Sequence, residues 1–336
     1  MPKYRSLGLI VLTLLPSALS IPASCDWASA SDVTTVQVVP DTRTLENLAV
    51  RSNGDIIVTS VASSTLFGLS SQGEHPPLPV AEISGVTGLL GIVELETDIF
   101  YVVGSNLTST EDSNGLWKID IRNFEAASNG TVIQPATTSL VTRLPSALQL
   151  NGLARLASND TKNLLVSDSS QGNVIRLNVD TKAVEVVIQL PEMAPLPTGL
   201  DIGVNGIRLR DNKLYFVSLD QGLFASVPIS LASGTPVGPV ETLASNITFG
   251  DDFGLSDDGR WAYVATNGPQ EIIGVDVSRG GKVVVAYSPL LGSASSVAVQ
   301  QLEGCRVLYV TGAIQSGNST VGHVSKITLK CKSDVY

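Results

Sequence analysis

The hydrophobic and polar positions of this chain repeat one short unit. In its clearest copy, Asn205 opens an apolar alternation that runs to Leu209, the turn Asp211-Asn212 follows, and a second apolar run ends in Tyr215-Phe216-Val217. Alternation with a period of two on both sides of a tight polar turn predicts a β-hairpin. The chain holds six such units, with almost no sign of helical periodicity.

The six units predict a closed ring of blades. Their opening residues are Glu46, Leu90, Asn151, Asn205, Asp251 and Ser295. A period of roughly 40 to 60 residues with several strands per unit predicts a six-bladed β-propeller, an all-β fold, rather than a sandwich. In a propeller the equivalent positions of all blades meet at the central axis. These six residues, far apart in sequence, are therefore expected to converge there.

A β-rich run over Val33–Val39 precedes the first unit. We expect it to pair as the outer strand of the last blade with Lys326-Ile327-Thr328-Leu329, because this closure hides two sheet edges. Residues 21–336 are then one domain, since each repeat needs its neighbours. The Pro-rich patches at 75–79 and 191–197 have the pattern of connections between blades, although an ordinary loop is the favoured interpretation of both.

The first twenty residues have the pattern of a secretory signal peptide. Lys3 and Arg5 precede an apolar core over 7–15, and the small residues of Ala18-Leu19-Ser20 follow. We expect signal peptide 1–20 to be cleaved after Ser20, because the core is shorter than the roughly 20 apolar residues of a membrane span. No later stretch is long and apolar enough to span a bilayer, so we expect a secreted protein without a membrane partner.

Secretion is consistent with the sequons and the cysteines. Cys305 and Cys331 are the preferred disulfide, and Cys25 with Cys331 is the rival pairing, because three cysteines leave one unpaired or intermolecular. Only some of the sequons are expected to carry glycans. The acceptor asparagines are Asn106, Asn129, Asn159, Asn246 and Asn318.

Charge narrows the class of partner. With 21 basic and 31 acidic residues, the formal net charge is −10. This argues against nucleic acid and anionic membrane surfaces, is compatible with cation binding, and leaves a small molecule as the expected partner. The oligomeric state stays open.

The axial set holds the candidate chemistry. Glu46, Asn151, Asn205 and Asp251 all offer oxygen, which a hard cation such as Ca²⁺ prefers. His75 and His323 are the only histidines, and neither is axial, so a Ser-His-Asp triad is not expected. The chain shows no Gly-x-Ser-x-Gly elbow and no glycine-rich phosphate loop, so no nucleotide or redox cofactor is expected.

Two interpretations of the axial set remain open. Polar residues at strand starts can simply hydrogen-bond the backbone across the channel. Alternatively, they form a site in which Leu90 and Ser295 complete a mixed wall for an apolar ligand. In the second case one carboxylate of Asp251-Asp252 could hold a cation while the other acts as a base. The neighbouring residues expected to line the same mouth are Asn47, Phe253 and Ser296.

Two motifs carry a resemblance. Val-Asn-Gly-Ile-Arg-Leu over 204–209 and Asp-Asp-Phe-Gly-Leu-Ser-Asp-Asp-Gly over 251–259, together with Glu46, resemble the six-bladed propellers of the gluconolactonase and regucalcin family. The resemblance implies that Glu46, Asn205 and Asp251 bind a divalent cation, often calcium. It also implies that Asp251 acts in lactone hydrolysis, with Asn151 as a nearby substrate or metal contact. The doubled Asp251-Asp252 before Phe253 departs from the family's usual Asp-Gly.

Within that family the chain resembles a secreted fungal branch, through Leu-Glu-Asn-Leu-Ala-Val-Arg-Ser-Asn-Gly over 45–54 and Gly-Asp-Asp-Phe over 250–253. Some members of the branch are hetero-Diels–Alderases that join a tropolone quinone methide to a humulene-type sesquiterpene. Such a reaction requires no cofactor and proceeds by orientation of two reactants. The resemblance therefore implies Asp251, Asp252 and Asn151 as polar catalytic groups, with Asn47, Leu90, Asn205, Phe253 and Ser295 contacting substrate.

Three functions follow from these observations. The fungal resemblance favours the cyclase, whereas composition and spacing alone favour a calcium-dependent lactone hydrolase. A secreted propeller that binds without catalysis is the third, since propellers host many functions.

Overall fold

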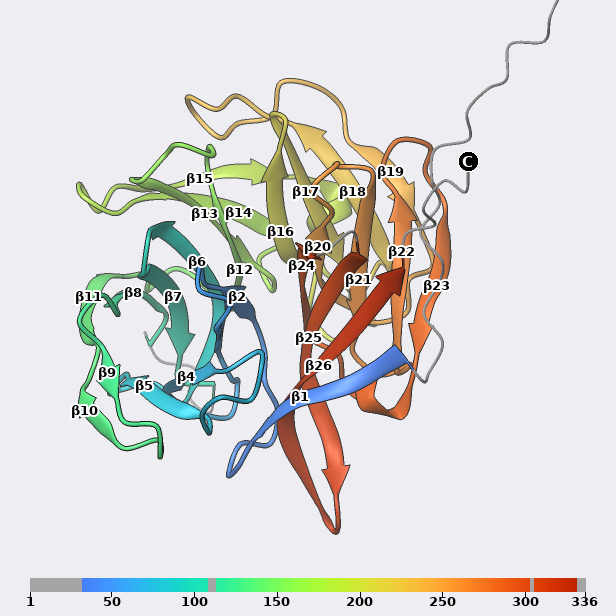
Figure 1. The fold of residues 1–336 in the computed structure, drawn as a ribbon. Coiled ribbons are helices and arrows are strands. Elements are labelled where there is room, and N and C mark those ends of the chain that lie inside the picture. Colours follow the sequence, from blue (N-terminus) through green and yellow to red (C-terminus); the bar gives the residue numbers. More distant parts are fainter. Residues whose placement is uncertain (1–31, 108–112, 303–304, 331–336) are drawn as a thin grey trace, which may run out of the picture.

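The computed structural model describes residues 32–107, 113–302 and 305–330 as a six-bladed β-propeller. Each blade is a four-stranded antiparallel sheet, and the innermost strands β2, β6, β12, β16, β20 and β24 surround the central channel (Figure 1). The predicted all-β propeller is confirmed. The helical segments with assigned bounds are short 3-10 turns, η2 (Pro191–Met193) and η3 (Pro289–Leu291).

The strands follow one another from the axis outward in most blades. Blade 1 holds β2 (Leu48–Val50), β3 (Ile56–Val58), β4 (Thr65–Leu69) and β5 (Leu78–Glu82); blade 2 holds β6 (Gly88–Glu96), β7 (Ile99–Ser105), β8 (Gly115–Asp120) and β11 (Thr137–Arg143); blade 3 holds β12 (Leu150–Arg155), β13 (Asn163–Asp168), β14 (Asn173–Asn178) and β15 (Val184–Gln189). Blade 4 holds β16 (Val204–Arg210), β17 (Lys213–Ser218), β18 (Leu223–Pro228) and β19 (Glu241–Ala244); blade 5 holds β20 (Gly250–Leu255), β21 (Trp261–Thr266), β22 (Glu271–Asp276) and β23 (Lys282–Tyr287).

The last blade closes the ring as expected. It contains β24 (Ser296–Leu302), β25 (Cys305–Ser316), β26 (Ser319–Lys330) and, outermost, β1 (Val33–Val39). Val33 pairs with Ile327 and Thr34 with Lys326. The predicted pairing of the run 33–39 with the segment 326–329 is therefore confirmed. Figure 1 shows β1 lying beside β26 although they stand at opposite ends of the chain.

Hydrophobic packing between blades explains why the inner strands are apolar on both faces. The structure has six clusters of buried hydrophobic side chains, and each joins two adjacent blades. The strand β7 illustrates the result, because all of its residues are buried. Burial on both faces of a blade stabilises the ring only when every neighbour is present.

The outer strands are the part that the sequence pattern failed to reveal. Strand β11 has four exposed residues at its start, and the hairpin of β9 (Glu125–Ala126) and β10 (Val132–Gln134) contains no buried residue in its strands. The patch at 191–197 does connect blades 3 and 4. The interpretation of 75–79 as a connection between blades was wrong, because Leu78-Pro79 already belongs to β5 of blade 1. The lack of a proline N–H is tolerated there because β5 is an edge strand.

No helix within the described part of the chain is long and apolar enough to cross a membrane.

Candidate functional site

The axial residues lie where the innermost strands begin, at local irregularities of the sheet. The ladder between the first and second strands shifts register at positions 89/92, 150/153, 204/207 and 250/253. Each shift leaves an axial pair outside the regular pairing, as a β-bulge does, and re-aims its side chains. All six axial side chains are buried: Glu46, Leu90, Asn151, Asn205, Asp251 and Ser295.

Hydroxyl groups on the second strands tie the axial positions together. Thr59 donates to the Leu90 carbonyl at 2.6 Å and Ser167 to the Asn205 carbonyl at 2.7 Å, each time in the following blade. Thr311 donates in the same way to the Glu46 carbonyl, across the closure of the ring. These bonds use the main-chain carbonyls of the axial residues and not their side chains.

Glycines permit the close approach of neighbouring blades at the axis. A Cβ at Gly91 would lie 2.2 Å from the Asn151 carbonyl oxygen, and one at Gly206 would lie 2.0 Å from Asp252 Oδ1. Real Cβ atoms do not tolerate such contacts, so a side chain here must push backbone or a carboxylate away. Glycine is therefore required next to the axial residue in these blades.

Replacing Gly206 by alanine is expected to lower the free energy of unfolding by about 1–3 kcal/mol, since overpacking forces neighbours to shift. The matched control is Gly104→Ala, whose new Cβ would lie 3.1 Å from side-chain atoms of Leu89 and Trp117 and 3.4 Å from the Gly88 carbonyl oxygen, which is an ordinary contact. Urea unfolding measures both. Equal effects of the two substitutions would contradict the close approach of blades 4 and 5.

Asp251 is held by two amides in a buried position. Its Oδ1 accepts from Asn205 Nδ2 at 2.7 Å and its Oδ2 from Asn267 Nδ2 at 3.0 Å. Loss of hydration on burial raises the pKa of Asp251 to about 7, and the neighbouring charge of Asp252 adds to this while the two amides oppose it. The carboxyl of Asp251 is therefore able to change protonation near neutral pH.

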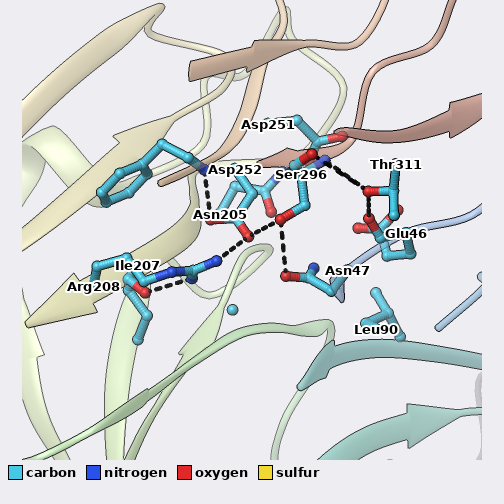
Figure 2. A network of polar contacts seen from close by, with 12 residues as sticks. Glu46, Asn47, Leu90, Asn205, Ile207, Arg208, Asp251, Asp252, Ser296 and Thr311 are labelled. Atoms are coloured by element: carbon cyan, nitrogen blue, oxygen red, sulfur yellow. Dashed lines mark hydrogen bonds and ion pairs between the residues drawn. The ribbon is translucent and has the colours of Figure 1, made fainter. Parts of the chain in front are cut away.

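Glu46 lies close enough to these acids to interact with them. Burial raises the pKa of Glu46 well above its usual value, and the charges of Asp251 and Asp252 raise it further. Like-charged carboxyls in one dry site favour sharing a proton or a cation. The structure thus brings together Glu46, Asn205 and Asp251, the three residues that the resemblance implied as ligands (Figure 2).

Asp252 belongs to a different network from Asp251. Its Oδ2 accepts from Arg208 and from the Ser296 hydroxyl, both at 2.7 Å, and its Oδ1 accepts from the Phe253 backbone N–H at 2.8 Å. Ser296 Oγ also lies 3.4 Å from Asn47 Oδ1. Figure 2 shows this chain from Arg208 to Asn47, which crosses blades 4, 5, 6 and 1.

Three residues expected at the site lie differently. Phe253 is fully buried and packs edge-on against Phe224, with ring centroids 4.9 Å apart, in the cluster between blades 4 and 5. Leu90 belongs to the cluster between blades 2 and 3. The Ser295 hydroxyl donates to the Ser293 carbonyl, and its neighbour Ser296 reaches Asp252 instead. The apolar surface expected of Phe253 is therefore core packing.

Arg208 and Asn267 are functional candidates that sequence reasoning did not select. Arg208 fills the polar position between Ile207 and Leu209 in the alternation of the first hairpin, so the pattern did not single it out. Asn267 follows β21 in a turn, and nothing in its local sequence marks it. The pairing of β20 with β21, in which Gly250 lies opposite Thr266, places it beside Asp251.

A divalent cation is implied by the family resemblance, and the donor set fits one. Asn151 Oδ1 and Asn205 Oδ1 are buried without a hydrogen-bond partner, and the Asn205 amide group also donates to the Asp251 carboxylate. Two carboxylates and two amide oxygens match the preference of Ca²⁺. Within the described ranges, no three His, Cys, Asp or Glu side chains are grouped to hold a metal, so the amide oxygens would have to complete the site.

Calcium is expected to raise the unfolding midpoint at slightly alkaline pH. A ligand that binds only the folded state at 100 times its Kd stabilises it by about 2.7 kcal/mol. Differential scanning fluorimetry with and without calcium measures this, and Glu46→Gln or Asp251→Asn is expected to remove the response, whereas Asp180→Asn at an exposed ion pair keeps it. A wild-type midpoint that is indifferent to calcium would argue against the cation site.

A cavity of about 700 Å³ lies among the inner strands of blades 1 to 4. Asn151, Asp251 and Asp252 are not among the residues that line it, whereas Arg208 is. A smaller cavity of about 340 Å³ shares Leu48, Arg208, Leu209 and Arg210 with it and extends to blades 5 and 6. Arg208 thus contacts the buried carboxylate of Asp252 and also lines both cavities.

The remaining predicted sites lie apart from this channel. Asn129, Asn159, Asn246 and Asn318 are exposed and Asn106 is half-buried, so glycosylation stays a prediction. Cys305 is half-buried, and the residue opposite it in the ladder is Lys330. Cys25, Cys331 and the predicted signal peptide 1–20 lie outside the described residues.

Comparison with known proteins adds to this geometry. No protein-family model matches the chain. A provisionally named hetero-Diels–Alderase of Phoma sp. is 30% identical over 240 residues, which are 63% of this chain and 66% of that protein. A second one, asR5 of Sarocladium schorii, is 28% identical over 257 residues, 68% of this chain and 59% of that protein. The chain resembles hetero-Diels–Alderases. It spans less than two thirds of each of these relatives, and their names support a cyclase-type role.

Solved structures support the fold. Regucalcin of Agrobacterium tumefaciens superposes with a TM-score of 0.59 at 16% identity, covering 89% of this chain and 94% of that one. A luciferin-regenerating enzyme gives 0.60 at 14% identity, covering 89% and 96%. At such identities the likeness concerns the propeller alone. The expected resemblance to the regucalcin kind of propeller and to hetero-Diels–Alderases is confirmed.

Proposed function

We propose that this protein is a secreted cyclase of secondary metabolism that performs a hetero-Diels–Alder reaction in its central channel. The reactants would be a tropolone quinone methide and a humulene-type sesquiterpene. The observation that carries the proposal is the cavity of about 700 Å³, which combines apolar walls with guanidinium groups. The names of the two sequence relatives support the reaction class.

The reaction is balanced without a further reagent. The quinone methide supplies the carbonyl oxygen and conjugated carbons of a heterodiene, and the sesquiterpene supplies one alkene. A new C–C bond and a new C–O bond form as π bonds are consumed, and no atom is lost. The protein therefore contributes orientation and stabilisation of charge on the oxygen, and no cofactor is required.

The proposal gives the residues of the cavity the following roles. Leu48, Leu153 and Leu209 would receive the apolar sesquiterpene. Arg208, with its side chain 25% exposed, would donate to the carbonyl oxygen as negative charge grows there. Asp252 would act as a positioning residue, because its carboxylate fixes Arg208 at 2.7 Å.

The test is an assay in which the quinone methide is generated beside the sesquiterpene. The wild-type protein is expected to accelerate adduct formation and to give one stereoisomer in excess. Leu209→Trp, which fills the cavity, should lower the rate roughly tenfold because the reactants lose their orientation. Leu140→Trp on the exposed face of β11 is the matched control. A racemic adduct at the uncatalysed rate would exclude the proposal.

A lactone hydrolase is the second candidate, favoured by the unpartnered amide oxygens of Asn151 and Asn205. A divalent cation bound there would polarise a lactone carbonyl. Asp251 would take a proton from the attacking water and return it to the ring oxygen as the ring C–O bond breaks. Turnover of simple lactones that stops on chelation would favour this candidate, whereas adduct formation that persists in chelator would favour the cyclase.

A further inference from the structure

Three arginines line the cavity, on two adjacent inner strands. Arg155 ends β12, and Arg208 and Arg210 belong to β16. The whole chain carries a net charge of −10, so a cluster of positive charge in its central cavity is the reverse of the overall balance. Apolar walls around the cluster weaken its screening by water.

The charge of Arg155 is not neutralised by its hydrogen bonds. It donates to the carbonyl oxygens of Glu94 and Leu95, both at 2.7 Å, and to that of Ser158. Carbonyl oxygens fix the guanidinium but carry no net charge. Arg155 is therefore held rigidly in the cavity with its positive charge available to a ligand.

Arg210 is held in a similar way. It donates to the carbonyl oxygens of Ser256 and Asp257 in the next blade. Its ion-pair partner Asp211 lies at 3.3 Å and has a side chain that is 86% exposed, so water screens that pair strongly. Arg208 alone of the three faces a buried carboxylate, that of Asp252.

The carboxylates of Glu94 and Asp160, near this cluster, accept hydrogen bonds from backbone N–H groups and not from its guanidiniums. Glu94 lines the cavity, but its Oε1 accepts from the Asp98 backbone N–H at 2.7 Å. Asp160 interacts with Arg155 over a longer range, and its carboxylate accepts from the backbone N–H groups of Lys162 and Asn163 in its own turn. The lining of the cavity thus holds the guanidiniums of Arg155, Arg208 and Arg210 against the carboxylates of Glu94 and Asp211, and neither carboxylate forms an ion pair with Arg155.

The rest of the lining is largely apolar. Leu231, which is 38% exposed, lies at the rim, and Ser158 and Asn212 beside it are also exposed, so the cavity is reached from this face of the propeller. The hydrophobic residues of the inner strands are Leu48, Val50, Ile92, Leu153 and Leu209. A ligand that fits both features has an apolar body and one acidic oxygen group.

We propose that the arginine side of this cavity is a binding site for the ionised acidic group of an apolar molecule, a carboxylate or an acidic enol. The apolar body lies against the inner strands of blades 1 to 3, and the guanidinium of Arg155 receives the anion. The inference deepens the proposed function, because it names the charge class of one reactant. Its test uses binding alone, so the cyclase assay and this test can fail independently.

Calorimetric titration of the full chain with 1-naphthoate and with its neutral counterpart 1-naphthylmethanol tests the site. The carboxylate is expected to bind about tenfold more tightly, as charge-assisted hydrogen bonds do. A parallel pair, laurate and dodecanol, shows whether an aromatic or a chain-like body is preferred. Equal affinities of acid and alcohol in both pairs would overturn the proposal.

Variants locate the site. Arg155→Met is expected to abolish the preference for the acid while leaving the affinity for the alcohol within about twofold. Arg143→Met is the matched control, because Arg143 also donates to a carbonyl, that of Ser113, but lies on the outer strand β11. Ala157→Phe, which narrows the cavity without changing charge, should weaken acid and alcohol alike. An unchanged preference in folded Arg155→Met would refute the site.

Discussion

Asp252→Ala is expected to lower the free energy of unfolding by about 3–5 kcal/mol. The Asp252 side chain is 2% exposed and accepts hydrogen bonds from Arg208, Ser296 and the Phe253 backbone. Its removal leaves a largely buried guanidinium without its counter-charge and a buried hydroxyl without its acceptor. The network also joins blades 4, 5 and 6, so its loss weakens two interfaces together.

Chemical unfolding of the purified variant gives this value. Asp180→Ala is the control, since Asp180 pairs with Lys162 at 2.9 Å but is 58% exposed, and such pairs contribute up to about 1 kcal/mol. A loss at Asp252 no larger than that at Asp180 would show that the network does not stabilise the ring.

Stability is expected to fall as the pH rises from about 4 to about 7 in cation-free buffer, through Glu46 and Asp251. The folded-state pKa of both is raised above the unfolded value, for Asp251 to about 7. The folded state therefore holds more protons in this range, and their contribution is present below the unfolded pKa and lost as the pH passes the folded pKa. For Asp251 alone the change amounts to about 4 kcal/mol.

Unfolding midpoints across this range measure the slope. Asp251→Asn removes the titrating group, so its stability is expected to vary less with pH than that of the wild type, whatever its absolute value. Other carboxyls have the opposite effect on stability at lower pH, in the wild type and in the variant alike. Asp258 is one example, because burial alone would raise its pKa but the Ser256 hydroxyl and other donors lower it below its usual value. Parallel pH profiles would contradict the raised pKa of Asp251.

The six-bladed ring could be predicted from the sequence because the inner strands repeat the same hydrophobic pattern in every blade. Alternation of apolar residues placed the inner hairpin of each blade, and the closing strand Val33–Val39 coincides with β1. The fourth strands escaped notice because they lie at the rim. There, β11 and β15 face solvent and carry no clear alternation.

The site was predictable only in part. Equivalent positions in the repeats identified Glu46, Asn205 and Asp251, because a propeller brings equal positions to one axis. The direction of each side chain depends on bulges and on glycine contacts such as that of Gly206 with Asp252, which no single-strand pattern reveals. For the same reason Phe253 turned into the core and Arg208 emerged as the group that reaches the cavity.

A crystal structure of the protein with the cycloadduct bound tests the central claim most directly. The account predicts the adduct within the central channel, with its apolar part against Leu153 and Leu209 and its ring oxygen within hydrogen-bonding distance of Arg208. An adduct bound outside the channel, on the loops or on the outer strands, would contradict it.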